Sequence, residues 1–515
     1  MAKKGANMYI FPSPAHKTTH FYVILMLLFF PLFFGPDGYV NITEFKYFFF
    51  VGLSCLWLVS LAVCGIIALK TGTRPIPPPS PVFYALSAFA LVACVSALVS
   101  PFGVSTIIGL GRFDGLITLL LYYAIFLGIS TFTQPREIYF AVFAVSVSVC
   151  CVVAIFQLFG FNPFRLFPGE YTHYDAHTLY TSEFLGTIGN TNLLSGLISL
   201  ALPLFAALFI TGTQKHRALY LIPLVLCTYT LIASRVAGGT LALIVCAVIS
   251  APILLTDTQR IEKALLVCSA ASLSAAFALS WKIDYTARML TAHLNPGAYS
   301  YVFLPAAFVA LLIFALLRIK KPVFHPQHLK KTLWITIAVA ALIFLLFLFF
   351  FPFREDSGTL FEFSRVLHGD IRDSFGSSRI QIWRKALELF KERPILGGGP
   401  GTFAARADIE FSRYIPETGD TLRAFVNNAH NDFLGYLTDF GAFGFITYTL
   451  ALILTLYLWF RRNANPSASA IGSALLGYWI QSFFGLNLFI VASFMWIFWG
   501  LFESKHHYIS EKEDS

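Results

Sequence analysis

The chain has 515 residues, of which 57% are hydrophobic and 12% are charged, and its formal net charge is +9. Soluble domains carry about 25% charged residues, because polar groups must cover much of their surface. The composition therefore excludes an aqueous globular fold and predicts an integral membrane protein. In such a protein the positive charge belongs to the loops between membrane spans and does not indicate a nucleic-acid partner.

Apolar runs follow one another along most of the chain, and a membrane-spanning helix needs roughly 20 mostly apolar residues. In chain order, the sequence predicts spans at 21–35, 46–69, 82–100, 115–132, 138–159, 189–212, 217–234, 238–256, 262–281, 299–318, 332–352, 433–460, 468–484 and 488–502. The first is short, and only Gly485-Leu486-Asn487 separates the last two, so the prediction is an all-α polytopic protein with about 12–14 spans. The first run lacks a cleavage site and is interpreted as a membrane helix rather than a signal peptide.

The eight cysteines all fall inside these apolar runs, and no Cys-x-x-Cys pair is present. This distribution predicts small buried apolar side chains, without a disulfide framework or a zinc site.

Lys and Arg gather in the short loops on one side of the predicted spans, which predicts that both termini are cytoplasmic. The longest loop, 353–432, then lies on the outer, periplasmic face. We expect four regions: N-terminal transmembrane helices at 1–184, central transmembrane helices with an outer-face arginine at 185–352, the large periplasmic loop at 353–432, and C-terminal transmembrane helices with a short cytoplasmic tail at 433–515.

A helical pattern stands out in the long loop between Ser377 and Glu392. Its apolar residues recur at helical spacing and are interleaved with basic ones, and Pro394 with the following glycines ends it. The apolar positions are Ile380, Trp383, Leu387 and Phe390. The pattern predicts an amphipathic helix on or near the outer membrane surface.

Polar groups cluster at the predicted outer face in three places, namely 186–192, 233–239 and the stretches of the long loop between 378 and 434. Arginine beside hydrocarbon is costly, so Arg235 between two tightly spaced spans is expected to face inward. Arg235 and Arg379 would be fixed cations for an anionic ligand, because a guanidinium donates two parallel hydrogen bonds to a phosphate. His430 would be a general base.

Plainer interpretations stay open for each of these residues. Arg235 would snorkel to the outer headgroups, Arg379 would belong to a solvated helix face together with Arg384, and His430 would be a hydrogen-bonded filler at the interface.

The sequence gives little support for two other kinds of site, a nucleotide site and a metal site. The glycine run Gly397–Gly401 lacks the Gly-Lys-[Ser/Thr] ending of a P-loop and does not follow a strand, so a nucleotide site is rejected. His173, Asp175 and His177 could bind a metal, but they lie in an irregular loop without another ligand.

Taken together, these motifs resemble the O-antigen ligase and polymerase family, most closely the lipopolysaccharide O-antigen ligases. The resemblance rests on the motifs Arg-x-x-Ile-Trp, Pro-x-Leu-Gly-x-Gly-x-Gly-x-Phe and His-Asn-Asp-x-Leu, in that order within one large outer loop. They are joined by Gly-x-x-Gly-Asn-x-Asn and Ser-Arg-x-small-Gly upstream. Their positions are 379–383, 394–403, 430–434, 186–192 and 234–238. The resemblance covers roughly residues 185–450.

The resemblance implies a metal-independent membrane glycosyltransferase of the GT-C-like kind, without a cofactor. It implies transfer of a glycan from undecaprenyl diphosphate to an acceptor hydroxyl, lipid A–core in the ligases, on the periplasmic side of a bacterial inner membrane. Carried over, His430 would be the base, and Arg379 and Arg235 would bind the diphosphate. We expect further substrate contacts from Asn190, Asn192, Asn428, Asn431 and Arg384.

Within this class, an O-antigen polymerase and a protein O-oligosaccharyltransferase stay open, because they share the motifs. A bicarbonate-type membrane transporter is the alternative from another class. A transporter places its polar groups near the middle of the bilayer, whereas here they gather at one face.

Overall fold

The computed structural model describes residues 13–70, 80–166, 174–175, 178–179, 185–213, 215–286, 289–294, 300–322, 324–354, 358–415, 420–462, 465–486 and 488–504. His173, His177, Asn487 and both chain ends, for which the sequence makes predictions, lie outside these residues.

Helices make up most of the described chain. In chain order they are α1 (Ser13–Leu28), α2 (Ile42–Lys70), α3 (Pro81–Leu98), α4 (Ser105–Ile108), α5 (Leu116–Phe132), α6 (Glu137–Leu158), η1 (Pro163–Arg165), α7 (Thr191–Thr211), η2 (Lys215–Tyr220), α8 (Leu221–Ser234), α9 (Ala237–Leu254), α10 (Thr258–Leu279), α11 (Ser300–Lys320), α12 (Pro326–Phe350), α13 (Thr359–Leu367), α14 (Phe375–Glu392), α15 (Phe403–Ala407), α16 (Asp432–Arg461), α17 (Pro466–Ser482) and α18 (Phe489–Phe502).

Each predicted span coincides with one of these helices. Ten described helices are long and apolar enough to cross a membrane, and α5 and α18 are apolar but shorter. The prediction of a polytopic helical membrane protein is therefore confirmed. Helix α1 begins at Ser13, well before the predicted span, because its polar first turns find partners in the bundle: His16 Nδ1 donates to the carbonyl of Phe132 at 2.7 Å, and His20 Nδ1 lies 2.8 Å from the Tyr139 hydroxyl.

Three antiparallel hairpins lie in the connections between helices, and the sequence did not predict them. They pair β1 (Tyr174–Asp175) with β2 (Thr178–Leu179), β3 (Trp281–Thr286) with β4 (Met289–Leu294), and β5 (Glu410–Ile415) with β6 (Asp420–Phe425). In the last hairpin Glu410 is opposite Phe425 and Ile415 is opposite Asp420. Strand β3 alternates apolar and polar residues over Trp281–Thr286, a strand pattern that the sequence analysis overlooked. Strands β4, β5 and β6 show no such regular alternation, so periodicity alone does not reveal them.

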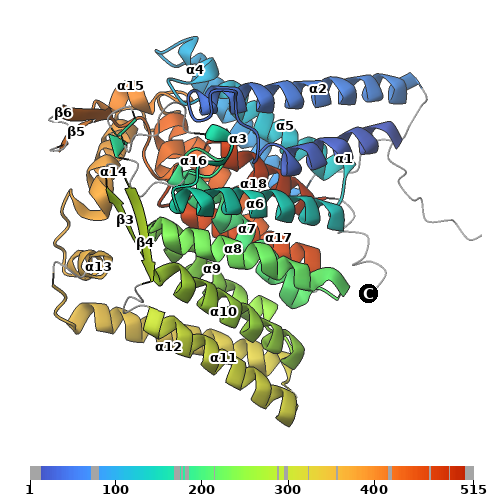
Figure 1. Cartoon of the computed structure of the whole chain (residues 1–515). Coiled ribbons are helices and arrows are strands. Elements are labelled where there is room, and N and C mark those ends of the chain that lie inside the picture. Colours follow the sequence, from blue (N-terminus) through green and yellow to red (C-terminus); the bar gives the residue numbers. More distant parts are fainter. Residues whose placement is uncertain are drawn as a thin grey trace, which may run out of the picture.

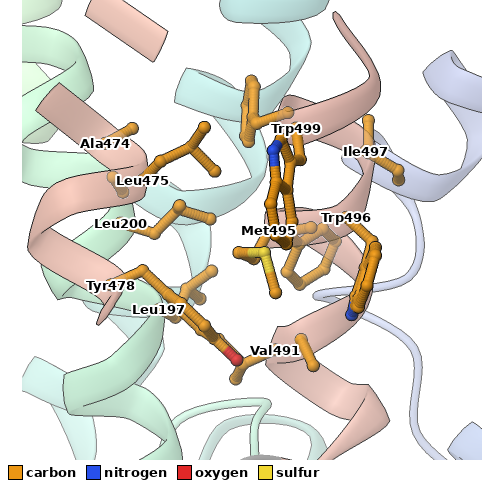
Figure 2. Close-up of a cluster of buried hydrophobic side chains, with 14 of the residues drawn as sticks. Leu197, Leu200, Ala474, Leu475, Tyr478, Val491, Met495, Trp496, Ile497 and Trp499 are labelled. Atoms are coloured by element: carbon orange, nitrogen blue, oxygen red, sulfur yellow. The ribbon is translucent and has the colours of Figure 1, made fainter. Parts of the chain in front are cut away.

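The core of the bundle is formed by α7, α17 and α18. All residues of α18 are buried, and so are most of those of α7 and α17. Figure 2 shows Leu197 and Leu200 of α7 and Tyr478 of α17 facing Met495 and Trp499 of α18. A helix that is apolar all round must be enclosed by other helices or by lipid. Here α18 is enclosed by protein, so it can be shorter than a lipid-exposed span.

Helices α11 and α12 lie at the periphery, where they pack on α10 and α9 (Figure 1). Only 11% of the apolar stretch of α11 and 6% of that of α12 is buried. Their large apolar side chains, such as Phe308 and Ile343, are exposed. In a membrane protein such a surface is covered by lipid.

Two of the eight cysteines, Cys55 and Cys268, are exposed, so the prediction of burial is wrong for these two. They lie on α2 and α10, helices whose apolar stretches are only partly covered by protein. A cysteine inside an apolar run can therefore face the outside of the bundle. All eight are free thiols.

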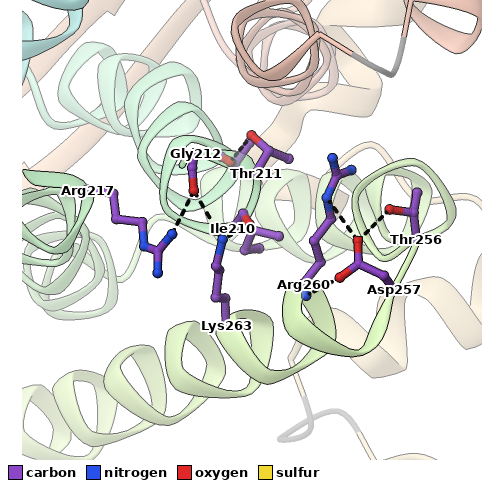
Figure 3. A network of polar contacts seen from close by, with 9 residues as sticks. Ile210, Thr211, Gly212, Arg217, Thr256, Asp257, Arg260 and Lys263 are labelled. Carbon is purple, nitrogen blue, oxygen red and sulfur yellow. Dashed lines mark hydrogen bonds and ion pairs between the residues drawn. The ribbon is translucent and has the colours of Figure 1, made fainter. Parts of the chain in front are cut away.

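A network of polar contacts covers the C-terminal end of α7 (Figure 3). Lys263 Nζ donates to the carbonyls of Ile210 and Gly212 at 3.0 and 3.1 Å, and Arg217 donates to Gly212 at 2.9 Å. The last carbonyls of a helix have no partner within the helix and carry partial negative charge. Two cations therefore cap the end of α7 opposite Asn190.

The short elements gather at one end of the bundle. Figure 1 shows α4, α14, α15 and the β5–β6 hairpin at the same end, beside the N-terminal part of α16. The amphipathic helix predicted at Ser377–Glu392 is present as α14, which packs against α16. This end carries the motifs of the long loop.

Candidate active site

Three segments that are far apart in the sequence are joined by backbone hydrogen bonds at this end. The N–H groups of Gly398 and Gly399 donate to the carbonyls of Thr438 and Asp439 at 2.9 Å each, and Leu110 donates to Gly401 at 3.1 Å. The loop before α5, the glycine run after α14 and the first turns of α16 therefore form one unit. That unit is the frame on which the site is built.

Glycine makes this close approach of the backbones possible. Gly397 has φ +70°, and a Cβ there would collide with the backbone of Asp439. Gly441 has φ 64° and ψ −163°, and a Cβ there would collide with the backbone of Ile395. Only glycine adopts such backbone angles readily. The glycine run thus serves backbone packing, in line with the rejection of a P-loop.

His430 lies in a tight turn that two asparagines shape. Its backbone has φ 47°, and its N–H donates to Oδ1 of Asn428 at 2.8 Å. Asn431 is buried and caps α16, with its Oδ1 accepting from the N–H of Leu434 at 3.1 Å. The predicted substrate-binding oxygens of Asn428 and Asn431 are therefore bonded to backbone, where they hold the histidine in place.

The imidazole lines a cavity of about 100 Å³ between this turn, the α4–α5 loop and the start of α18. Arg112 and Asp114 line the same cavity. Burial, together with the positive charges of Arg379 and Arg112, lowers the pKa of His430 to about 4. At neutral pH the side chain is therefore an uncharged imidazole, the form that can accept a proton.

Arg379 stands at the first right-handed turn of α14. The residues before it, Gly376, Ser377 and Ser378, all have positive φ, so the chain makes a left-handed turn immediately ahead of the arginine. One guanidinium nitrogen donates to the carbonyl of Gly376 at 2.9 Å, whereas Nε is buried without a hydrogen-bond partner. Burial lowers the pKa of Arg379, and Glu362 opposes that shift. The structure thus brings Arg379 into the electrostatic environment of His430.

Arg384, one helical turn further, is engaged elsewhere. Its guanidinium forms an ion pair with Asp373 at 3.1 Å and a hydrogen bond to the carbonyl of Ile371 at 3.1 Å. More than half of the side chain is exposed. These contacts match the plainer interpretation of Arg384 as part of a solvated face.

Arg235 lies in the two-residue turn between α8 and α9, in the left-handed conformation with φ 53°. Its side chain is exposed, which differs from the inward orientation expected, because the turn lies at the helix ends and not between the helices. Arg235 does not line the His430 cavity. The start of α9, directly after this turn, does lie against the α17–α18 connection, since a Cβ on Gly238 would be 3.0 Å from Cβ of Phe484.

The α17–α18 connection links these parts of the site. Phe483 packs edge-on against Trp383 of α14 with ring centroids 5.6 Å apart, and it also contacts Phe433. Leu486, three residues on, lines the His430 cavity. The α17–α18 connection, which lies against the start of α9 just after Arg235, therefore also contacts the helix of Arg379 and lines the cavity of His430.

A second and larger cavity, of about 460 Å³, adjoins the first, and Arg112 and Leu486 line both. Asn190 lines it and caps α7, with Oδ1 accepting from the N–H groups of Asn192 and Leu193 at 2.9 and 3.1 Å. Asn192 is not among the lining residues, and its carbonyl lies 3.5 Å from Nε2 of Gln481.

Arg112 and Asp114 are site residues that the sequence analysis missed. Arg112 is largely buried, which lowers its pKa, while the neighbouring carboxylate of Asp114 raises it. Burial raises the pKa of Asp114 to about 6, and its Oδ1 has no hydrogen-bond partner. The signal that could have revealed them is the run Gly109-Leu-Gly-Arg-Phe-Asp-Gly115, which brackets two charges with glycines at the end of a span.

Among the residues that the structure describes, no group of three or more His, Cys, Asp or Glu side chains could hold a metal ion. Metal independence stays a prediction, and His173 and His177 lie outside the described residues.

Comparison with protein families gives one match. Residues 296–449 match the family model of the O-antigen ligase domain, a segment that contains Arg379, Arg384, Asn428, His430 and Asn431. No curated protein matches the chain. The match supports the resemblance found in the sequence: residues 296–449 of this multi-pass membrane protein are similar to the O-antigen ligase family.

Proposed function

We propose that the protein transfers a glycan from undecaprenyl diphosphate to a hydroxyl acceptor, with lipid A–core as the first candidate, on the periplasmic side of the bacterial inner membrane. One observation carries this proposal. His430 is held neutral in a cavity beside Arg112, under the influence of Arg379, within the segment that matches the O-antigen ligases.

In the proposed reaction, the acceptor hydroxyl gives its proton to His430 as its oxygen attacks the anomeric carbon of the donor glycan. The bond from that carbon to the diphosphate oxygen breaks, and undecaprenyl diphosphate leaves with the bonding electrons. The products are the glycosylated acceptor, the lipid diphosphate and a protonated His430. Negative charge grows on the leaving group, and guanidinium groups nearby stabilise it.

The arginines give His430 a basicity that depends on the donor. Arg379 and Arg112 lower the pKa of the imidazole in the free protein. A diphosphate bound beside them would compensate their charge and raise that pKa toward its ordinary value. The base would thus gain proton affinity once the donor is in place.

Arg379 is the first candidate for contact with the diphosphate, because its Nε is buried without a hydrogen-bond partner and can donate to a ligand. Arg235 is exposed on the turn just before α9, whose first residues lie against the α17–α18 connection. We assign it to the lipid end of the diphosphate.

The orientation of the site also belongs to the proposal. The end that carries α14, α15 and the β5–β6 hairpin would be periplasmic and both termini would be cytoplasmic, as the distribution of Lys and Arg predicts. The four regions 1–184, 185–352, 353–432 and 433–515 are kept as the proposed organisation.

The test is a transfer assay with purified protein, undecaprenyl-diphosphate glycan and lipid A–core. Wild type should glycosylate the core, whereas His430→Ala, Arg379→Ala and Arg235→Ala should each lose at least about a hundredfold in rate, within the range of general-base and oxyanion contributions. Arg384→Ala, an arginine held by Asp373, should have a mild effect. Equal losses from all four variants would refute the assignment of the site.

The product of the wild-type reaction decides between the related activities. A longer lipid-linked glycan would identify a polymerase, and a glycosylated protein acceptor would identify an O-oligosaccharyltransferase. Full activity in EDTA is expected, and strong inhibition by EDTA would contradict metal independence.

A further inference from the structure

The cavity of about 460 Å³ is formed where four parts of the chain meet. These are the start of α2, the start of α7, the α4–α5 loop and the segment leading into α18. Its volume lies within the range of about 300–1,000 Å³ that is typical of sites for small organic ligands. The cavity is therefore large enough for an extended polar molecule, and the proton-transfer step described above does not use it.

The lining has a particular chemistry. It contains one cation and one anion, Arg112 and Glu44, together with the amide of Asn190, the hydroxyl of Thr43 and the ring of Phe113. These groups offer both donors and acceptors, and an aromatic face lies among them. A sugar presents the same combination, since each hydroxyl donates and accepts while the ring C–H groups are apolar. Aliphatic residues such as Ile42 and Leu488 also line the cavity, but a lipid chain would leave the charges of Arg112 and Glu44 without partners, and a diphosphate would be repelled by Glu44.

Arg112 connects this cavity to the reacting groups. Its side chain lines both the larger cavity and the cavity of His430, and the carboxylate of Asp114 acts on it electrostatically. The guanidinium has five N–H donors in a planar arrangement. It can therefore contact a ligand in the larger cavity within reach of the atoms that react at His430.

We propose that the larger cavity is a glycan-binding subsite of the transfer site, in which Glu44, Thr43 and Arg112 bind sugar hydroxyls. This proposal rests on the proposed function: Arg112 lines both cavities, so a sugar bound in the larger one would lie beside His430. The sugar belongs either to the acceptor, whose hydroxyl loses its proton, or to the donor, whose anomeric carbon is attacked.

Binding is tested without catalysis on the full-length protein in nanodiscs. The probes are the core oligosaccharide freed of lipid A and the repeat-unit oligosaccharide freed of its lipid diphosphate, each followed by saturation-transfer NMR. One of them should bind wild type, and Glu44→Gln should weaken its Kd about tenfold, since a charge-assisted hydrogen bond is lost. Thr43→Val, which removes the hydroxyl at nearly constant shape, should weaken the same probe by a smaller factor.

Glu388→Gln is the matched control, because Glu388 lies on the exposed face of α14 and lines neither cavity. Its Kd should equal that of wild type. The probe that responds to Glu44→Gln identifies the sugar as acceptor or donor. The subsite is refuted if neither probe binds wild type, or if Glu44→Gln and Thr43→Val bind both probes as wild type does.

Transfer kinetics separate the two proposals. Glu44→Gln should raise KM for the substrate carrying the responsive sugar about tenfold, with kcat within about twofold of wild type and the other KM unchanged. Transfer with unchanged KM values would refute the subsite and leave the function standing. A wild-type protein that transfers nothing but shows binding sensitive to Glu44→Gln would refute the function and leave the sugar site standing.

Discussion

The basicity of His430 depends on two arginines that come from opposite halves of the chain. Arg379 belongs to the long loop and Arg112 to the α4–α5 loop, and both act with burial to lower the pKa of the imidazole to about 4. Removing either charge should raise that pKa toward 6.5, the ordinary value of histidine.

This sets a prediction for the pH dependence of transfer. In wild type, kcat/KM should fall with acidification only near pH 4, because the free protein needs a neutral imidazole. In Arg112→Gln the acid limb of this pH profile should move to higher pH, whatever the absolute rate, because one of the positive charges that lower the pKa of His430 is removed. The limb should stay in place in Arg393→Gln, an exposed arginine outside both cavities. An unmoved limb in Arg112→Gln would contradict the electrostatic coupling.

Protonation of the same residue should also affect stability, with a sign that can be worked out. The folded protein binds a proton at His430 only below about pH 4, whereas the unfolded chain binds it below about 6.5. The unfolded state therefore binds more protons in that window, and stability from this group is present above pH 6.5 and is lost as the pH falls toward 4. Asp114, whose pKa is raised to about 6, acts in the opposite sense.

The contribution of His430 is therefore measured as a difference. The thermal midpoint of wild type minus that of His430→Gln should fall between pH 6.5 and 4, corresponding to as much as roughly 3 kcal/mol at 1.36 kcal/mol per pKa unit. A constant difference across this window would show that the pKa of His430 is not depressed.

At the scale of elements, the site depends on the docking of the glycine run onto α16. Gly441 has backbone angles that only glycine adopts readily, and its Cα lies against the backbone of Ile395. Gly441→Ala should therefore destabilise the protein by roughly 3 kcal/mol and abolish transfer, because strain and a backbone collision add.

Gly52→Ala in α2 is the matched control. Gly52 is helical and a Cβ there meets no atom within 4 Å, so this change should leave stability unaltered or raise it by up to about 1 kcal/mol. Both variants are compared by thermal unfolding in one detergent. Equal midpoints would show that the backbone contact at Gly441 is dispensable.

The cap on α7 is a second element-scale feature, at the end remote from the site. Lys263→Met should lower the stability by about 1–2 kcal/mol, because it leaves the carbonyl of Ile210 without its charged donor and that of Gly212 with Arg217 alone. Lys331→Met, at an exposed position of α12, should have little effect. Below its melting temperature, Lys263→Met should transfer glycan at the wild-type rate, since the cap is at the C-terminal end of α7 and the site adjoins its N-terminal end.

The helices could be predicted because a long apolar run has few alternatives in a membrane, so each predicted span matches a helix. The amphipathic helix α14 and the motif of His430 were also visible in the sequence. The β5–β6 hairpin and the role of Arg112 were not. Arg112 lies near His430 because hydrogen bonds join segments some 300 residues apart, such as the bond from Leu110 to Gly401. A local sequence pattern cannot reveal such a contact.

For the molecule as a whole, the outstanding question is which end faces the periplasm, because the donor and the acceptor must reach His430 from that side. We predict that Ser412→Cys on β5 reacts with a membrane-impermeant maleimide applied to cells with a permeabilised outer membrane, whereas Lys331→Cys at the start of α12 reacts only after lysis. Both positions are exposed and lie in different extramembrane parts of the chain. Wild type, with its eight free thiols, supplies the background. The reverse pattern would place His430 on the cytoplasmic side, where a periplasmic transfer is impossible, and would overturn the proposed function even if the purified protein bound glycans.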